Sequence, residues 1–328
     1  MDVVVTDLWE DYPEIAEEMK AVEEFIKAGV TSRNSLLADI AGTLAGAGGK
    51  RLRPSFVVLS ARFGKYDREK TLPLAGAVEV LHMATLVHDD VIDRAGMRRG
   101  KPTVSQKYGI DMAVYTGDFL FTKAVLMLSG NVQADRLDLV ARAVKTICEG
   151  EVDQFQERYD IETSILSYLK RINKKTAILF AASCLLGAYS SECGEDTARS
   201  LARFGLCFGM AFQIKDDLLD FLSDFETTGK PVGSDLRGGV VTMPVIYALR
   251  SSRRLQELFK GYAGKKGRFS FDEYRLVNEL VRESGGIEST AGMLRRYVDR
   301  GLKALERLPE NDERSILRRL LQGLDTDQ

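Results

Sequence analysis

The sequence predicts an all-α fold, and three observations support this prediction. Apolar residues recur mostly at spacings of three and four residues, which gives a helix one apolar face. Proline breaks helices, and the chain has only 7 prolines in 328 residues, with none between residues 103 and 230. Strand signals are limited to two short apolar runs, Val3–Val5 and Phe56–Leu59, and neither has a hairpin turn beside it.

The predicted helices follow one another with little chain between them. The first carries an apolar stripe separated by acidic residues, formed by Ile15, Met19, Val22, Phe25 and Ile26. Later helices are predicted over residues 71–93, 111–129, 136–159, 164–189, 197–225 and 241–259, with shorter and more charged helices after residue 259. Glycine and proline mark predicted loops at Gly46–Pro54, Gly96–Pro102 and Ser223–Gly239. Because no low-complexity linker interrupts this pattern, residues 1–328 are predicted to form a single domain, although the length alone would allow two.

Composition and charge exclude several classes of protein. A formal net charge of −2 argues against nucleic acid as a partner, since such partners favour strongly basic domains. The longest uncharged run, Thr176–Ser191, has sixteen residues and is shorter than the ~20 that span a membrane, so it predicts a buried core helix. The acidic amino terminus lacks the basic segment of a secretory signal. Four scattered cysteines without a Cys-x-x-Cys pair indicate free, mostly buried thiols in a cytoplasmic protein.

Two aspartate clusters carry the main chemical signal. Asp-Asp-Val-Ile-Asp at 89–93 recurs in form as Asp-Asp-Leu-Leu-Asp at 216–220. Residues four apart share a helix face, so Asp89 pairs with Asp93 and Asp216 pairs with Asp220. Either cluster alone could be a solvated helix end. Two matching clusters in otherwise apolar helices instead favour Mg²⁺, which takes oxygen ligands and is often shared with substrate phosphates.

Basic residues gather in four short segments, two of which follow the aspartate clusters. The segments are Gly48–Pro54, Arg98–Pro102, Lys174–Thr176 and Thr227–Pro231. Arginine binds phosphate oxygens in a bidentate manner and lysine supplies a compact charge. Together with the carboxylates, these segments predict a polyphosphate site with metal between acid and phosphate. The two histidines, His82 and His88, lack ligand spacing and are expected to form hydrogen bonds instead.

With these motifs in order, nearly the whole chain resembles the trans-isoprenyl diphosphate synthases. Within that family, its overall sequence pattern is most similar to the catalytic component of bacterial heptaprenyl diphosphate synthase. The resemblance rests on GGKRLRP (48–54), LVHDDVIDRAGMRRGKPT (86–103), GEVDQF (150–155), KKT (174–176), FQIKDDLLDF (212–221) and GKPVGSDL (229–236). It implies an isoprenoid-synthase-type bundle of many antiparallel helices around a deep central cavity, usually as a dimer.

The resemblance also implies roles for individual residues. Three Mg²⁺ ions would be held by Asp89, Asp93, Asp216 and Asp220. The allylic diphosphate would be contacted by Arg98, Lys175, Gln213 and Lys230 and oriented by Thr176. Isopentenyl diphosphate would be held by Lys50, Arg53, His82 and Arg99.

These roles imply a prenyltransferase that adds isopentenyl diphosphate to farnesyl or geranylgeranyl diphosphate. Lys175, Lys230 and Arg98 would stabilise the charge that develops on the leaving group. In the family, the released pyrophosphate takes the proton and the apolar helical bundle keeps water from the carbocation.

Small residues at positions 84 and 85 predict a long product. In the family, large aromatic residues four or five positions before the first aspartate give short products, and here Ala84 and Thr85 occupy those positions. We therefore expect a linear all-trans polyprenyl diphosphate such as heptaprenyl, used for quinone side chains. A short-chain synthase is the alternative if Phe119 or Phe121 closes the pocket deeper down.

Two other classes of protein share parts of this pattern. In a terpene cyclase the second metal motif usually mixes Asn, Ser or Thr with Glu, whereas here it is all aspartate. A non-catalytic regulatory subunit typically lacks the clusters. The heptaprenyl resemblance leaves open whether the partner is a second copy of the chain or a small regulatory subunit.

Overall fold

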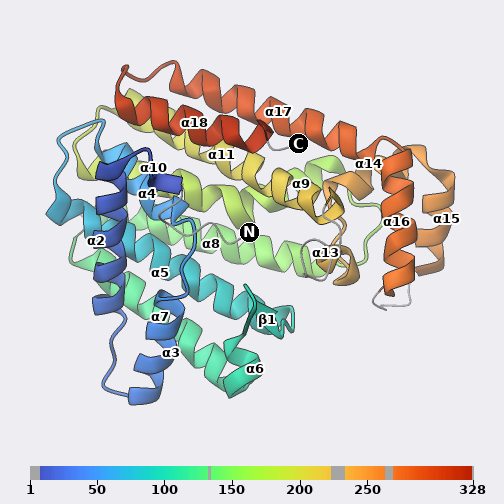
Figure 1. Cartoon of the computed structure of the whole chain (residues 1–328), viewed down its shortest axis with the longest axis horizontal. Helices are drawn as coiled ribbons and strands as arrows, with labels where there is room; N and C mark the ends of the chain where they lie inside the picture. Colours follow the sequence, from blue (N-terminus) through green and yellow to red (C-terminus); the bar gives the residue numbers. More distant parts are fainter. Residues whose placement is uncertain (1–7, 132–133, 223–232, 263–268, 327–328) are drawn as a thin grey trace. The chain divides into compact units, whose positions relative to one another are not determined.

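A computed structural model describes residues 8–131, 134–222, 233–262 and 269–326. These residues are almost entirely helical (Figure 1), which confirms the all-α prediction. The strands among them are β1 (Met97–Arg98) and β2 (Lys101–Pro102), which pair antiparallel with Met97 opposite Pro102.

The weak strand signal at Phe56–Leu59 does not correspond to a strand: these residues lie in a helix, α4 (Leu52–Ala61), and are all buried. A short apolar run does not by itself distinguish a strand from a helix that is buried on every side. The other strand signal, Val3–Val5, lies outside the described residues.

The chain divides into two compact units, each assembled from two stretches of sequence. The first comprises Met1–Ala141 and Ala182–Ala202, and the second comprises Arg142–Ala181 and Arg203–Gln328. Three helices contribute residues to both units: α8 (Ala134–Gln156), α10 (Ile178–Ser190) and α11 (Glu195–Leu222). The single domain expected from the sequence stays a prediction.

The first unit is built around α5 (Arg68–Ile92), which packs against α2, α4 and α7. The other helices of this unit are α2 (Pro13–Gly29), α3 (Ser35–Ala45), α6 (Val104–Tyr108) and α7 (Ile110–Ser129). Side chains of Asn34, Asp67 and Thr103 accept hydrogen bonds from the first turns of α3, α5 and α6, which fixes where these helices begin. Gly117 of α7 lies against the His88 ring of α5 and leaves no room for a Cβ, so the two helices approach closely.

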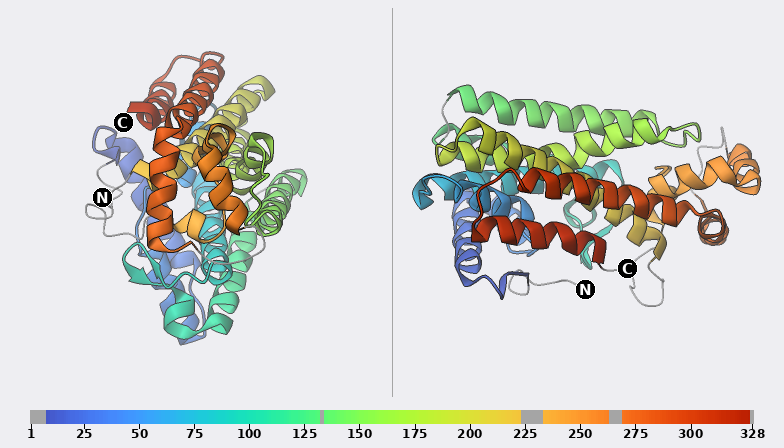
Figure 2. Two further views of the ribbon diagram at one scale, coloured as in Figure 1. Left: turned by 90° about the vertical axis from the view of Figure 1, so that its right-hand side faces the viewer. Right: turned by 90° about the horizontal axis from the view of Figure 1, so that it is seen from above.

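The second unit contains the carboxyl-terminal helices. They are α9 (Ile165–Ile172), the π-helix η1 (Asn173–Ala177), α13 (Ser234–Arg237), α14 (Met243–Ser251), α15 (Arg253–Tyr262), α16 (Phe271–Glu283), α17 (Gly286–Leu305) and α18 (Asp312–Thr326). Figure 2 shows α17 and α18, in red, lying side by side, and the two helices pack together. Part of the core is an aromatic cluster in which Phe208 lies 5.3 Å from Phe180, 6.1 Å from Phe204 and 6.2 Å from Phe212 between ring centroids.

Three predicted helices differ from the observed ones. The helix expected over 164–189 is interrupted by η1, and the helix expected over 241–259 is divided at Ser252, whose backbone is extended. With 20 residues, α17 is not short as expected after residue 259. Apolar periodicity continues across these interruptions, so it does not reveal them.

Within the described chain, one helix is long and apolar enough to cross a membrane, namely α5. However, 72% of its apolar window is buried inside the protein, as in the core helix of a globular fold. The run Thr176–Ser191 is also largely buried, as predicted. The cysteines are free, as predicted. Cys184 and Cys207 are buried and Cys193 is half-buried, whereas Cys148 is exposed.

Candidate active site

The first aspartate cluster lies in the last turn of α5. Asp89 is half-buried and Asp93 is exposed, and the two share one face of the helix. A helix carries partial negative charge at its carboxyl end, and no basic residue of α5 lies in its last turn. Two carboxylates in this position repel each other and the helix dipole, so the site favours a bound cation.

The middle aspartate of this cluster has a different role. Asp90 is buried and accepts hydrogen bonds from Arg98, whose Nε lies 2.8 and 3.0 Å from its two carboxylate oxygens. The Arg98 Nη2 atom also lies 2.8 Å from Asp90 Oδ1. Burial raises the pKa of Asp90, although Arg98 opposes the shift. The Arg98 guanidinium, expected at the allylic diphosphate, thus ties the β1–β2 hairpin to α5.

The loop before α4 is held by a buried arginine that sequence reasoning missed. Arg51 Nη1 lies 2.7 Å from Glu79 Oε1 of α5, Nη2 donates to the Ala45 carbonyl at 2.7 Å, and Nε lies 3.4 Å from Glu23 Oε1. Arg51 has a left-handed backbone with φ of 45°, which is unfavourable for a residue with a Cβ. Its position among three cations of one motif gave no signal that it alone is buried.

The residues expected to hold isopentenyl diphosphate lie on adjoining elements of the first unit. Lys50 and Arg53 flank the start of α4, His82 lies on α5, and Arg99 lies in the β1–β2 hairpin. Arg99 Nη1 donates to the carbonyl of Gly48 at 2.7 Å, which joins the hairpin to the loop. The structure therefore places Arg53 and Arg99 near His82, and holds the loop that carries Lys50 against the hairpin.

The electrostatics of this group favour an anion. Burial lowers the pKa of Arg53 to about 10, with Glu79 opposing the shift, so Arg53 stays charged at neutral pH. Burial, followed by the charges of Arg53 and Arg99, lowers the pKa of His82 well below 6.5. His82 is therefore neutral beside these cations, and its hydrogen-bonding role stays a prediction. His88 Nε2 lies 3.4 Å from the Val114 carbonyl oxygen, in accord with the role predicted for it.

In the second unit, the expected phosphate contacts lie on the π-helix η1. Lys174 Nζ lies 2.7 Å from Asp153 Oδ2, and Lys175 Nζ lies 2.9 Å from Glu151 Oε1, both on α8. A Cβ on Gly150 would lie 2.8 Å from the Lys174 Cβ, so this glycine lets α8 approach the π-turn. Isolated π-turns are frequent at functional sites because they redirect side chains.

The second aspartate cluster lies near the end of α11, where Asp216 is exposed and Asp220 half-buried. The backbone N–H of Gly233 donates to Asp220 Oδ1 at 3.0 Å. Asp235 of α13 was not singled out from the sequence. Its pKa is raised well above 3.8 by burial and then by Asp217 and Asp220. This crowding of carboxylates again favours a bound cation.

The middle aspartate of this cluster is buried too. Asp217 accepts a hydrogen bond from the Tyr168 hydroxyl at 2.6 Å and another from Gln213 Nε2 at 2.9 Å. Burial raises its pKa to about 7. Gln213 Oε1 in turn accepts from the Thr176 hydroxyl at 2.8 Å. Tyr168 gave no signal in the sequence beyond its place in a predicted helix.

The donor set fits a divalent cation that is shared with a substrate. Among the described residues, no group of three or more His, Cys, Asp or Glu side chains could hold a metal by itself. Magnesium is commonly held by one or two carboxylates and completes its octahedral shell with water and substrate phosphates. The pairs Asp89–Asp93 and Asp216–Asp220 match that requirement.

The remaining predicted residues are one lysine expected at the allylic diphosphate and the residues expected to control product length. Lys230 lies outside the described residues. Ala84 is buried at 1% exposure in α5, and the Thr85 hydroxyl donates to the His82 carbonyl one turn earlier. Phe119 is half-buried and Phe121 is 38% exposed on α7.

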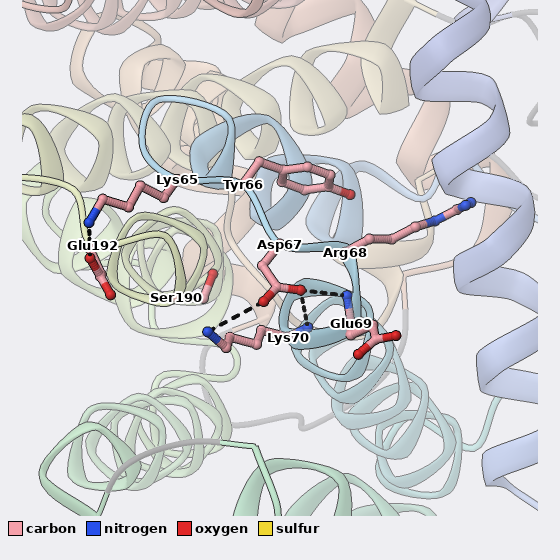
Figure 3. A pocket seen from close by; sticks show the side chains of 8 residues that line it. All are labelled: Lys65, Tyr66, Asp67, Arg68, Glu69, Lys70, Ser190 and Glu192. Atoms are coloured by element: carbon pink, nitrogen blue, oxygen red, sulfur yellow. Dashed lines mark hydrogen bonds and ion pairs between the residues drawn. The ribbon is translucent and has the colours of Figure 1, made fainter.

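A separate pocket of about 520 Å³ lies at the other end of α5 (Figure 3). From its Asp67 side chain to Asp89 the chain runs through about six helical turns, or roughly 33 Å. Lys65 pairs with Glu192 at 2.8 Å and Lys70 pairs with Asp67 at 3.3 Å. No residue predicted from the sequence to bind substrate lines this pocket.

Comparisons with known proteins agree with the motifs. Residues 34–271 match the polyprenyl synthetase family model. Heptaprenyl diphosphate synthase component 2 of Geobacillus stearothermophilus is 41% identical over 94% of this chain and 95% of its own length. Octaprenyl diphosphate synthase of Escherichia coli is 33% identical over 92% and 93%.

Solved structures of related enzymes are similar to this chain in both fold and sequence. Heptaprenyl diphosphate synthase from Staphylococcus aureus has a TM-score of 0.89 at 35% identity, covering 95% of this chain and 98% of its own. A polyprenyl synthase from Caulobacter crescentus, crystallised with calcium and isoprenyl diphosphate, has a TM-score of 0.91 at 34% identity, covering 100% and 99%. These matches confirm the isoprenoid-synthase fold and a long-chain trans-prenyltransferase activity. The chain belongs to the polyprenyl synthetase family.

Proposed function

We propose that this prenyltransferase adds isopentenyl diphosphate repeatedly to farnesyl or geranylgeranyl diphosphate and releases a heptaprenyl-sized product for quinone side chains. One observation carries the proposal: in each unit a carboxylate pair at helical spacing accompanies lysines and arginines. Carboxylates in such a pair call for a cation, and the neighbouring basic groups call for an anion. A diphosphate bound through a metal ion satisfies both requirements.

The first unit supplies the groups for isopentenyl diphosphate. Lys50, Arg53 and Arg99 provide positive charge, and neutral His82 provides a hydrogen bond without adding charge. Arg53 is suited to this role because it keeps its proton at neutral pH although it is half-buried. Arg51 acts indirectly, by holding the loop on which Lys50 lies.

The second unit supplies most of the groups that we propose for the allylic diphosphate, and Arg98 belongs to the first unit. Lys175 lies next to Thr176 on η1, and Gln213 touches Thr176. In the reaction, the bond between the allylic carbon and the diphosphate oxygen breaks, and its electron pair leaves with pyrophosphate. The alkene of isopentenyl diphosphate attacks the allylic cation, and the released pyrophosphate takes the proton lost in forming the new double bond. Lys175, with Lys230 and Arg98, stabilises the charge on the leaving group.

Magnesium is the cofactor that we propose, with three ions held by Asp89, Asp93, Asp216 and Asp220. When bound, the ions act as Lewis acids that neutralise the departing pyrophosphate. Without a cation, the paired carboxylates would repel the diphosphate. Replacing Asp89 or Asp216 by Asn should therefore abolish elongation, whereas Asp299→Asn, at an exposed position on α17, should leave it unchanged.

The product assay tests the proposal. The protein is incubated with isopentenyl diphosphate, farnesyl or geranylgeranyl diphosphate and Mg²⁺, and the dephosphorylated products are separated by chromatography. We expect a linear ladder that ends near seven isoprene units, since Ala84 and Thr85 are small. A ladder that ends at the geranylgeranyl length would support a short-chain synthase closed at Phe119 or Phe121. Absence of any elongated alcohol, with the chain alone and with a small subunit added, would refute the proposal.

We further propose that the active form is a dimer in the cytoplasm. One exposed side of α7 carries large apolar side chains: Ile110 (62%), Val114 (37%), Tyr115 (61%), Phe121 (38%), Val125 (41%) and Leu126 (60%). Apolar patches of this kind mark interaction surfaces, and two-fold homodimers are the commonest assembly. The relatives called component 2 support a small regulatory subunit as the alternative partner.

Light scattering of the purified chain distinguishes a homodimer from a monomer that awaits another subunit. Free cysteines support a reducing compartment.

A further inference from the structure

A chain of hydrogen bonds in the second unit connects three helices. The Tyr168 hydroxyl of α9 donates to Asp217 Oδ2 of α11 at 2.6 Å. Gln213 Nε2, one turn earlier in α11, donates to Asp217 Oδ1 at 2.9 Å. The Thr176 hydroxyl of η1 donates to Gln213 Oε1 at 2.8 Å.

The donor and acceptor of each hydrogen bond in this network are fixed by the chemistry of the groups. Tyr168 is fully buried and Asp217 is 3% exposed, so each oxygen of the carboxylate has a donor in place of water. An amide can present either oxygen or nitrogen, but a flipped Gln213 would point its oxygen at the Asp217 carboxylate. Asp217 therefore sets the amide orientation, and the amide sets the direction in which Thr176 donates.

These contacts separate Asp217 from its neighbours in the same motif. Asp216 is exposed and Asp220 half-buried on the face expected to bind metal, whereas the oxygens of Asp217 are directed at Tyr168 and Gln213. A carboxylate held in this way acts on other side chains. The phenol of Tyr168 holds Asp217 in place from a separate helix.

We infer that Tyr168 and Asp217 are positioning residues that set the orientation of Gln213 and Thr176 for the allylic diphosphate. The inference rests on the proposed function, because Gln213 and Thr176 are placed at that substrate there. Loss of the phenol hydroxyl should leave Asp217 able to rotate, and should loosen Gln213 and Thr176 without removing either.

The test is Tyr168→Phe, which removes one oxygen atom and keeps the ring. Loss of a hydrogen bond to a charged group corresponds to roughly a 10- to 100-fold change. We expect kcat/KM for the allylic primer to fall by that factor, while KM for isopentenyl diphosphate, held in the first unit, stays within about twofold of wild type. Tyr297→Phe on α17, whose ring lies against Arg300, is the matched control and should match wild type.

Two further measurements separate positioning from a general structural role. In a Gln213→Leu background, Tyr168→Phe should have little additional effect on kcat/KM for the allylic primer, because Asp217 reaches Thr176 only through Gln213. Binding of an unreactive farnesyl thiolodiphosphate, followed by calorimetry, should weaken about tenfold in Tyr168→Phe, with a melting temperature lowered by no more than about 5 °C.

The outcomes divide clearly. Wild-type kinetics and wild-type analogue binding in Tyr168→Phe would overturn the inference. Equal losses for both substrates together with lower melting would also overturn it, in favour of a structural role. A wild-type protein that binds the analogue but elongates nothing refutes the proposed function, and the calorimetric comparison then still decides the role of Tyr168.

Discussion

The ion pair between Arg51 and Glu79 offers the sharpest test of how the first unit is held together. The side chains are 3% and 9% exposed, and their charged atoms are 2.7 Å apart. Removing one member of a buried pair leaves the other charge without its partner, at a cost of about 3–5 kcal/mol. Glu23 is a weaker substitute for Glu79, because its oxygen lies 3.4 Å from Arg51 and its side chain is 26% exposed.

The left-handed backbone at Arg51 adds a second, opposing effect. Any residue with a Cβ loses about 1–2 kcal/mol in this conformation, whereas glycine adopts it freely and loses about 0.5–1 kcal/mol more chain entropy on folding. Arg51→Gly should therefore be more stable than Arg51→Ala by about 1 kcal/mol, although both lose the ion pair.

Thermal unfolding followed by circular dichroism measures this order. With an unfolding entropy of about 2.1 cal/mol/K per residue over the chain, 1 kcal/mol corresponds to a shift of about 1.5 °C. Arg51→Ala should melt about 4–7 °C below wild type, and Arg51→Gly about 1.5 °C above Arg51→Ala. In both variants KM for isopentenyl diphosphate should rise, because the loop bearing Lys50 is released.

The exposed pair Lys65–Glu192, with side chains 84% and 69% exposed, is the control. Lys65→Ala should melt like wild type, because solvent screens such pairs. The reasoning fails if Arg51→Ala also melts like wild type, or if Arg51→Gly melts below Arg51→Ala.

Four further predictions follow from individual contacts. Ala84→Phe should shorten the product ladder, since Ala84 is 1% exposed; an unchanged ladder would remove Ala84 from the control of length. Gly150→Ala should lower kcat/KM for the allylic primer, because its Cβ would lie 2.8 Å from Lys174 Cβ, whereas Gly292→Ala on α17, with open space around it, should be neutral or stabilising by up to about 1 kcal/mol in urea unfolding. The folded pKa of His82 lies well below 6.5, so the unfolded chain takes up a proton that the folded chain does not. Stability should fall as the pH drops through 6.5, less so in His82→Gln, and equal slopes for the two proteins in urea titrations would contradict this. Chelation of divalent ions should stop elongation, with Mg²⁺ restoring it; full activity in chelator would exclude the metal role of the aspartate pairs.

Much of the fold was predictable because helix periodicity depends on local sequence. The stripe from Ile15 to Ile26 and the pattern over 111–129 correspond to α2 and α7 within a few residues. The π-turn η1 was not predictable, because the residues that allow it, Gly150 and Gly209, belong to α8 and α11. A Cβ on Gly209 would lie 2.5 Å from the Ala177 Cα. Such close approaches between separate helices leave no periodic signal.

The two aspartate clusters show which properties of the site follow from the sequence alone and which follow from the tertiary structure. By itself, the sequence determines that the first and last aspartates of each cluster share a helix face, since spacing on a helix is a local property. It thereby determines the chemistry of carboxylates, cation and phosphate. Only the tertiary structure decides that Asp90 and Asp217, each turned about 100° from that face, are buried against Arg98 and against Tyr168 and Gln213. Arg98 and Tyr168 come from other elements of the same unit, so their contacts exist only once the chain has folded, whereas Gln213 lies one turn before Asp217 on α11 itself.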